Sequence, residues 1–263
     1  MKKFLRELSH RMEIPLIGVA DAGRWKTPLF DPWIPSAFHP QAILPETRSV
    51  IVIGLPVHLP VLETSPSIWY RELYKTINSL LDQYTYRISS LLNEQGYSSV
   101  FIPRDGYGSI QVLRKNPIAF FSHRHAAVLA GLGTFGTNNM VLTPAYGPRV
   151  RFGTVFTSAE IDPDPFMERD LCIRCNRCVN LCPTHALEEG EYPGNLTDKN
   201  TCADYSSELN QKFISPCGVC IKVCPVGADR EGYNRTDPAI YSSGSGGEGL
   251  QRSWDHVRQY GSL

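Results

Sequence analysis

The sequence predicts an α+β protein, α/β-like in its alternation of elements, with a sheet domain followed by a smaller cysteine-rich domain. Residues 1–165 contain no cysteine and alternate the apolar patterns of helices and strands. All eight cysteines fall between Cys172 and Cys224. Prolines flank Asp164 and mark a linker between the two parts. We therefore expect domains at residues 1–165 and 166–229, and a tail at 230–263.

The first half opens with a helix and continues with a buried strand and a long helix. Met1–Pro15 is charged and amphipathic, unlike a secretory signal. Arg48–Leu55 is a β-branched apolar run typical of a buried strand. Between Ile68 and Leu92, apolar residues recur every three or four positions, which predicts a long amphipathic helix that ends near Gly96.

The middle of the chain carries signals for shorter elements. Ser99–Pro103 and Val150–Thr157 read as strands. Ser122 is placed to cap a helix over His123–Ala130, with Gly131 as its terminator. In the tail, Ser242–Gly249 has the composition of a flexible linker. A short helix carrying Trp254 and His256 is expected at Gln251–Tyr260.

The composition is that of an ordinary globular protein. The formal net charge is zero, which removes any global electrostatic argument for binding nucleic acid or an anionic membrane. No apolar run approaches membrane-spanning length. We expect a cytoplasmic protein, because reduced thiols persist there.

The cysteines form two runs whose spacing is typical of two iron–sulfur clusters. The first run is C-x2-C-x2-C-x3-C-P from Cys172, and the second is a lone Cys202 followed by C-x2-C-x3-C-P from Cys217. Each cubane cluster needs four thiolates, and in such runs the cysteine before proline binds the other cluster. This predicts a domain like that of bacterial ferredoxins. Cluster one takes Cys172, Cys175, Cys178 and Cys224, and cluster two takes Cys182, Cys202, Cys217 and Cys220.

Three other interpretations of the cysteines are weaker. Disulfides fit a secreted protein, and no signal peptide is evident. Zinc sites usually pair two C-x2-C knuckles rather than this pattern. The third interpretation is a purely structural cluster, although two clusters that exchange their fourth cysteine ligands suit electron relay better.

Gly131-x-Gly133-x-x-Gly136 matches the dinucleotide-binding glycine pattern, but its context argues against a nicotinamide site. That pattern should follow a strand and open a helix, whereas here a helical segment precedes it and Met140–Leu142 reads as a strand. The glycines still allow a close approach of the backbone to a neighbour, which is either a packed element or a flat cofactor.

The run Ala126–Ala159 (AAVLAGLGTFGTNNMVLTPAYGPRVRFGTVFTSA) leads into Cys172 and resembles the block that precedes the clusters in epoxyqueuosine reductases and corrinoid-dependent reductive dehalogenases. The resemblance implies a nitroreductase-like domain that binds a cobamide, with two 4Fe-4S clusters supplying electrons to cobalt. It also implies a corrinoid wall formed by Gly131, Gly133, Gly136, Asn138, Thr143, Tyr146, Gly147, Arg149 and Arg151.

The reductive cleavage that this resemblance implies needs a proton donor near the substrate. Epoxyqueuosine reductases carry an acidic residue shortly before this block, whereas Lys115–His125 contains none. The candidates are His123, His125, Tyr107, Tyr70 and Asp105. Histidine titrates near working pH, and two histidines two positions apart on a helix face different sides.

Three functions remain open at this point. The first is a corrinoid-dependent reductase of a small organic substrate that receives electrons from ferredoxin or flavodoxin. The second is a non-catalytic electron donor or activator for a corrinoid protein or metalloenzyme partner. The third is a reductase that binds flavin in the same pocket.

Overall fold

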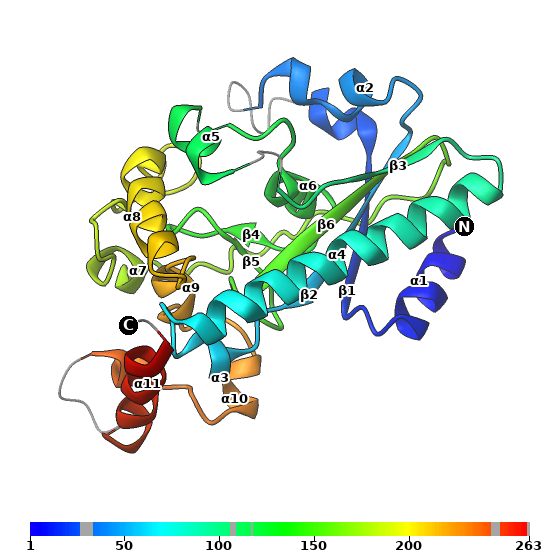
Figure 1. Ribbon diagram of the computed structural model, residues 1–263. Coiled ribbons are helices and arrows are strands. Elements are labelled where there is room, and N and C mark those ends of the chain that lie inside the picture. Colours follow the sequence, from blue (N-terminus) through cyan, green and yellow to red (C-terminus); the bar gives the residue numbers. More distant parts are fainter. Residues whose placement is uncertain (27–33, 106–108, 117, 243–247, 262–263) are drawn as a thin grey trace.

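The computed structural model describes residues 1–26, 34–105, 109–116, 118–242 and 248–261. A four-stranded antiparallel sheet forms the centre of the first part, in the order β1-β2-β6-β3 (Figure 1). Its strands are β1 (Leu16–Asp21), β2 (Ser49–Pro56), β6 (Val150–Thr157) and β3 (Ser99–Ile102). A separate ribbon pairs β4 (Thr134–Phe135) with β5 (Val141–Leu142).

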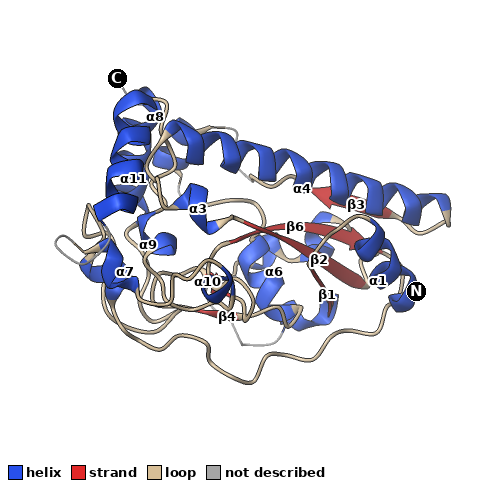
Figure 2. Ribbon diagram, turned by 90° about the horizontal axis from the view of Figure 1, so that it is seen from below, coloured by secondary structure: helices blue, strands red, loops and turns tan. Residues whose placement is uncertain are grey.

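Helices cover both faces of this sheet, and each face has its own apolar core. On one face, α4 (Ile68–Glu94) and α1 (Lys2–Arg11) pack against Ile51, Ile53 and Val155. On the other face, α6 (His123–Leu129) packs against alternate residues of the same strands, such as Val52 and Phe156. The alternation follows from the two-residue period of a strand, so the sheet forms the middle of three layers (Figure 2).

The long helix α4 begins and ends where local chemistry predicts. The Ser67 hydroxyl accepts a hydrogen bond from the Tyr70 N–H at 3.1 Å, which caps the first turn. Ile77, Leu81 and Ile88 lie on its buried stripe. After the helix, Gly96 takes a φ of +86°, a conformation that glycine adopts at little cost.

The sequence signals for these elements are confirmed, as is the mixed α/β class. Among the elements with no recognised signal are β1, α5 (Ile110–Lys115) and α8 (Lys199–Gln211). Only 13 residues long and mostly polar, α8 has no clear apolar period. It is capped instead by the Asp198 carboxylate, which accepts from two N–H groups at 3.0 Å.

The cysteine-rich half consists of loops and short helices around a small apolar cluster. Its buried members are Cys178, Leu187 and Val223. A core of this size contributes little stability, and such domains usually depend on metal centres or other cross-links.

Within the residues that the structure describes, five helices have only four residues each. They are α2 (Pro40–Ile43), α3 (Leu59–Leu62), α7 (Arg177–Asn180), α9 (Val219–Lys222) and α10 (Asp229–Gly232).

The segment that joins the two parts is bonded to β1. The Asp164 N–H donates to the Val19 carbonyl at 2.8 Å, and the Asp164 carboxylate accepts from the Val19 N–H at 2.9 Å. Lys2 forms an ion pair with the same carboxylate at 2.8 Å. The predicted linker is therefore held against the sheet and α1.

The chain closes with α11 (Glu248–Gly261), which packs near the start of α4 (Figure 2). Trp254 is buried and stacks on Tyr241 with ring centroids 5.8 Å apart. Most of the predicted Gly/Ser linker lies outside the described residues. No helix in the described part of the chain is both long and apolar enough to cross a membrane.

Candidate functional site

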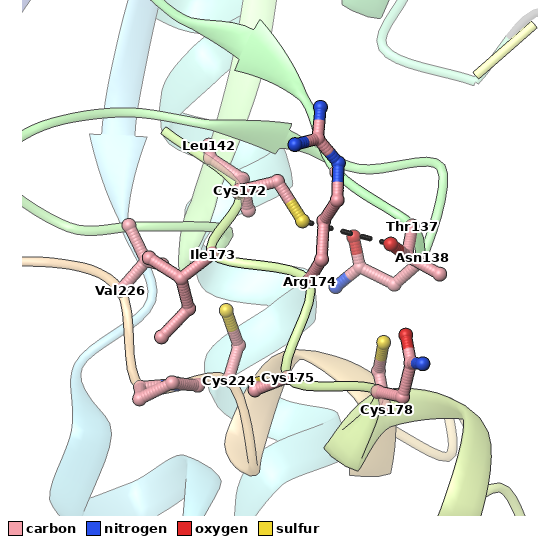
Figure 3. A pocket seen from close by; sticks show the side chains of 13 residues that line it. Thr137, Asn138, Leu142, Cys172, Ile173, Arg174, Cys175, Cys178, Cys224 and Val226 are labelled. Carbon is pink, nitrogen blue, oxygen red and sulfur yellow. Dashed lines mark hydrogen bonds between the residues drawn. The ribbon is translucent and has the colours of Figure 1, made fainter. Parts of the chain in front are cut away.

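The structure brings Cys172, Cys175, Cys178 and Cys224 around one pocket (Figure 3). Three of them come from the first cysteine run, and Cys224 comes from the loop after α9. Asn176 and Gly218, which precede α7 and α9, adopt left-handed φ values of +54° and +74°. These turns bend both loops tightly, so that thiols from distant parts of the chain reach the pocket. They are the four residues assigned to cluster one.

The remaining four cysteines lie close enough together for their thiols to influence one another's pKa. Burial raises the pKa of Cys217 to about 11, and nearby Cys202 and Cys182 raise it further. Burial also raises the pKa of Cys220 well above its ordinary value, and Cys217, Cys202, Cys178 and Cys182 add to the effect. Cys182, Cys202, Cys217 and Cys220 are therefore neighbours, as expected for cluster two.

The chemistry of the two thiol groups fits a cluster better than a single ion. All eight thiols are free of disulfides. Burial raises the pKa of Cys178 to about 12, so a group of four thiolates here needs a positively charged centre. Among the described residues, no three Cys, His, Asp or Glu side chains converge tightly enough to bind one metal ion. A cubane binds each thiolate through a different iron atom, so its ligands stand farther apart.

The Ala126–Ala159 block forms the surface against which the cysteine loops lie. The Thr137 hydroxyl is 3.6 Å from the Cys172 sulfur, within hydrogen-bonding reach. The Asn138 amide donates to the Cys220 carbonyl at 3.3 Å. Gly136 and Asn138 line the pocket of cluster one. This block therefore contacts both thiol groups.

Three glycines of the predicted corrinoid wall lie against the chain itself. A Cβ added at Gly131 would stand 2.0 Å from the Pro165 carbonyl oxygen, and one at Gly133 would stand 2.0 Å from that of Leu142. At Gly147 the corresponding distance, to the Val226 oxygen, is 1.9 Å. At each of these three glycines, the space that a Cβ would occupy is therefore bordered by a backbone carbonyl of this chain. Contact of these glycines with a corrinoid remains a prediction.

Arg149 anchors the second cysteine loop to the sheet domain. Its side chain is fully buried, and its Nε and Nη2 atoms bind the two oxygens of Asp229 at 2.8 and 2.6 Å. Nη1 donates to the Cys224 carbonyl at 3.0 Å, and Nη2 also donates to that of Val226 at 2.7 Å. Protein groups thus occupy its donors. Thr143 and Tyr146 form the adjacent turn, in which the Tyr146 N–H donates to the Thr143 hydroxyl at 3.2 Å.

Arg151 belongs to a polar cluster on the α4 side of the sheet. Its Nε donates to the Asn78 side chain at 3.0 Å, and its Nη2 lies 3.4 Å from an Asp105 oxygen. The guanidinium also lies over the Tyr74 ring, 4.3 Å from its centroid. Tyr74 in turn packs edge-on against Tyr70. We name Tyr70, Tyr74, Asn78, Asp105 and Arg151 the polar cluster.

The polar cluster adjoins the second thiol group through Tyr70. This side chain is buried, and a Cβ at Gly218 would stand 2.6 Å from its ring. Burial raises the pKa of Tyr70, nearby Tyr74 adds to this, and the charge of Arg151 opposes it. Thiolates at Cys220 and Cys217 raise it further. The phenol therefore keeps its proton at neutral pH.

The two candidate histidines are held neutral by the protein. The His123 Nε2 atom lies 3.0 Å from the Pro103 carbonyl and must donate to it, so Nδ1 accepts from the Thr154 hydroxyl at 2.8 Å. Burial lowers its pKa to about 4. His125 bonds the Ser122 hydroxyl at 2.6 Å and the Tyr192 hydroxyl at 2.7 Å, and burial lowers its pKa to about 3. Both imidazole rings are therefore unprotonated near pH 7.

Among the other candidate acids, Asp105 is paired with Arg104 as well as Arg151. Tyr107 lies outside the described residues. The sequence analysis did not identify Thr137, Tyr192, Asp229 or Arg230 as site residues. The partners of Thr137, Tyr192 and Asp229 are distant in the chain, and those of Arg230 are mostly backbone carbonyls, so no spacing signal could have found them.

The comparisons with known proteins agree with this arrangement. Residues 171–228 match the model of the 4Fe-4S dicluster domain. The chain is 27% identical over 194 residues to a tetrachloroethene reductive dehalogenase of Desulfitobacterium hafniense, a match covering 67% of this chain and 32% of that protein. It is 26% identical over 220 residues to an epoxyqueuosine reductase of Bacillus cereus, covering 79% and 55%. The chain thus spans about a third of the first relative and about half of the second.

Solved structures of both kinds share the fold. The epoxyqueuosine reductase of Streptococcus thermophilus aligns with a TM-score of 0.59 at 19% identity, over 91% of this chain and 70% of its own. The catabolic reductive dehalogenase NpRdhA, in complex with 3-bromo-4-hydroxybenzoic acid, aligns with a TM-score of 0.63 at 18% identity, over 95% and 35%. The resemblance found in the sequence is therefore confirmed.

Proposed function

We propose that this chain, whose homologues are epoxyqueuosine reductases and reductive dehalogenases, is a reductase of a small organic substrate. Electrons would pass through its two 4Fe-4S clusters to a bound cobamide. The observation that carries the proposal is the division of eight thiols into two groups of four, both in contact with the Ala126–Ala159 block. A solved reductive dehalogenase of this fold is described as B12-dependent, and it aligns with 95% of this chain.

The polar cluster supports a reacting site beside cluster two. The glycine side of the predicted corrinoid wall fits a planar cofactor poorly, because backbone carbonyls fill the space there. Arg151 and Asn78 are side chains of the kind that bind carboxamides, and a bound cofactor would have to replace the 3.0 Å bond between them. When bound, a cobamide would supply the low-valent metal chemistry that reductive cleavage requires. In a nitroreductase-like domain, Arg151 and Asn78 would be the residues that orient the bound groups.

Tyr70 is the candidate best placed to hold a proton for this chemistry. Its phenol stays protonated at neutral pH, and it lies between the thiols of cluster two and Arg151. The two histidines stay unprotonated at that pH. A catalytic role for His123 or His125 as an acid would require their rings to gain a proton against the cost of burial.

A second candidate function is a non-catalytic electron carrier that keeps a corrinoid protein or metalloenzyme reduced. The neutral, fully hydrogen-bonded histidines favour it, because an electron carrier needs no proton donor. Ferredoxin or flavodoxin would supply the electrons in either case. The relatives lend no support to flavin in place of a cobamide.

An anaerobic titration tests the proposal. Protein with reconstituted clusters is titrated with cobalamin and followed by electron paramagnetic resonance (EPR). One cobalt(II) signal per chain, with axial coordination different from that of free cobalamin, is the expected result. Absence of binding at concentrations that saturate a dehalogenase would reject the cobamide reductase. Turnover of a halogenated or epoxide substrate without a partner protein then separates the enzyme from the carrier.

A further inference from the structure

Two buried guanidinium groups converge on one backbone atom beside cluster one. The carbonyl oxygen of Cys224 accepts from Arg149 Nη1 at 3.0 Å and from Arg230 Nε at 2.8 Å. The exposed fractions of the two arginines are 0% and 1%. Cys224 lines the cluster-one pocket, so both charges lie close to a ligand of that cluster.

The two guanidinium groups differ in how their charge is balanced. Arg149 forms a two-point ion pair with Asp229. Arg230 instead donates to backbone carbonyls, namely those of Cys224, Lys222 and Arg235, the last at 3.1 Å. It also donates to the Tyr241 hydroxyl at 3.2 Å and lies over the Tyr241 ring, 5.4 Å from its centroid. Among the described residues, no carboxylate bonds to Arg230.

The nearest acid in this network is already engaged. The Tyr241 hydroxyl donates to Glu63 at 2.7 Å, and the same carboxylate oxygen is bound by Arg235 at 3.0 Å. Glu63 therefore balances Arg235 first. A fully buried charge that lacks an opposite charge is costly, so Arg230 calls for another anionic partner. A 4Fe-4S cluster with four thiolate ligands carries a net negative charge, which becomes more negative by one on reduction.

We infer that Arg230 is a tuning residue that raises the reduction potential of cluster one. When one electron from a low-potential donor enters the cluster, a nearby buried cation stabilises the added negative charge. Net charge and solvent exposure are among the factors that set the potentials of such clusters. The inference rests on the two-cluster function proposed above and adds a residue outside the cysteine runs that controls it.

Three variants test this role in the complete chain with reconstituted clusters. Arg230→Gln removes the buried charge and keeps a hydrogen-bond donor, while Arg230→Lys keeps the charge. Arg174→Gln is the matched control, because Arg174 also lines the cluster-one pocket but its side chain is 57% exposed and paired with Asp170 and Glu191. Its charge is therefore screened by water.

The measurement is a redox titration monitored by EPR, with iron content determined for each variant. At a fixed potential, Arg230→Gln should lower the ratio of reduced to oxidised cluster one about tenfold, which equals about 59 mV for one electron. Arg230→Lys and Arg174→Gln should change this ratio by less than about threefold, which by the same relation is under 30 mV. Cluster two should shift less than cluster one.

A cluster-one midpoint in Arg230→Gln equal to that of the wild type would overturn the inference. Loss of cluster one from both Arg230 variants would also overturn it, because Arg230 would then serve the fold alone. Failure of the proposed function has a different signature, namely no cobalt(II) signal in the cobalamin titration, and it leaves both clusters and the cluster-one midpoint measurable.

Discussion

Replacement of Gly147 by alanine should displace the second cysteine loop. Gly147 has a φ of +53°, and an added Cβ would stand 1.9 Å from the Val226 carbonyl oxygen. An ordinary contact at this position begins at 3.4 Å. The loop would therefore have to retreat by about 1.5 Å, the difference between these two distances. Val226 is two residues from Cys224, so the displacement reaches a ligand of cluster one.

Two costs add at this position. A left-handed conformation costs a residue with a Cβ about 1–2 kcal/mol. Overpacking against a fixed neighbour costs about 1–3 kcal/mol more. Gly96→Ala isolates the first cost, because Gly96 also has a positive φ, of +86°, but has no atom within 4 Å of an added Cβ. We therefore expect the Gly147 variant to be less stable than the Gly96 variant by about 1–3 kcal/mol.

Melting temperature and iron content, measured anaerobically at one heating rate, provide the assay. For a chain of this size, 1 kcal/mol corresponds to about 2–4 °C. Gly96→Ala should melt slightly below the wild type and keep its full iron content. Gly147→Ala should melt several degrees lower still and lose cluster one first. Equal melting temperatures and equal iron contents in the two variants would refute the reasoning, because the backbone contact would then cost nothing.

Three further predictions follow from the buried polar groups and from the thiols. The pKa of His125 is about 3 in the folded chain and about 6.5 when unfolded, so its contribution to stability is present above pH 6.5 and is lost as pH falls. Between pH 7.5 and 5, the difference in unfolding free energy between wild type and His125→Gln should shrink by about 2 kcal/mol, and a constant difference contradicts this. Arg149→Met should cost about 3–5 kcal/mol by leaving the Asp229 carboxylate unpaired, and should speed iron loss to a chelator. If the double variant with Asp229→Asn recovers none of the lost unfolding free energy, the ion pair of Arg149 with Asp229 is not the cause of the loss. Cys182→Ser should remove cluster two and leave most of cluster one, as read from EPR, and the reverse loss would disprove the crossed ligation.

Local signals in the sequence were enough to predict most of the sheet and its long helix. The apolar period of α4 and the glycine after it mark its ends closely, and the β-branched runs mark β2 and β6. The missed strand β1 pairs with β2, which lies about thirty residues further along the chain. The missed helix α8 depends on the Asp198 cap and on packing against α5 rather than on its own apolar period.

The candidate site divides in the same way. The two thiol groups follow from spacing, because a cluster imposes a repeating geometry on its ligands. The partners of the basic residues do not, since Arg149 and Asp229 are 80 positions apart and His125 and Tyr192 are 67 apart. Sequence reasoning identified the glycines as points of close approach, but only the fold shows that carbonyls of the chain itself fill that space.

The bonds between Asp164 and Val19 also affect how this protein can associate. In the strand order of the sheet, β1 is paired on one side only, and an open strand edge is a template for pairing with another chain. The Asp164 backbone and carboxylate occupy the free N–H and carbonyl of Val19, and Lys2 and Arg6 fix that carboxylate in place. The connection to the cysteine-rich part thus covers this edge at Val19. Cutting the chain there would uncover Val19, so the sheet domain expressed alone should aggregate more readily than the full chain.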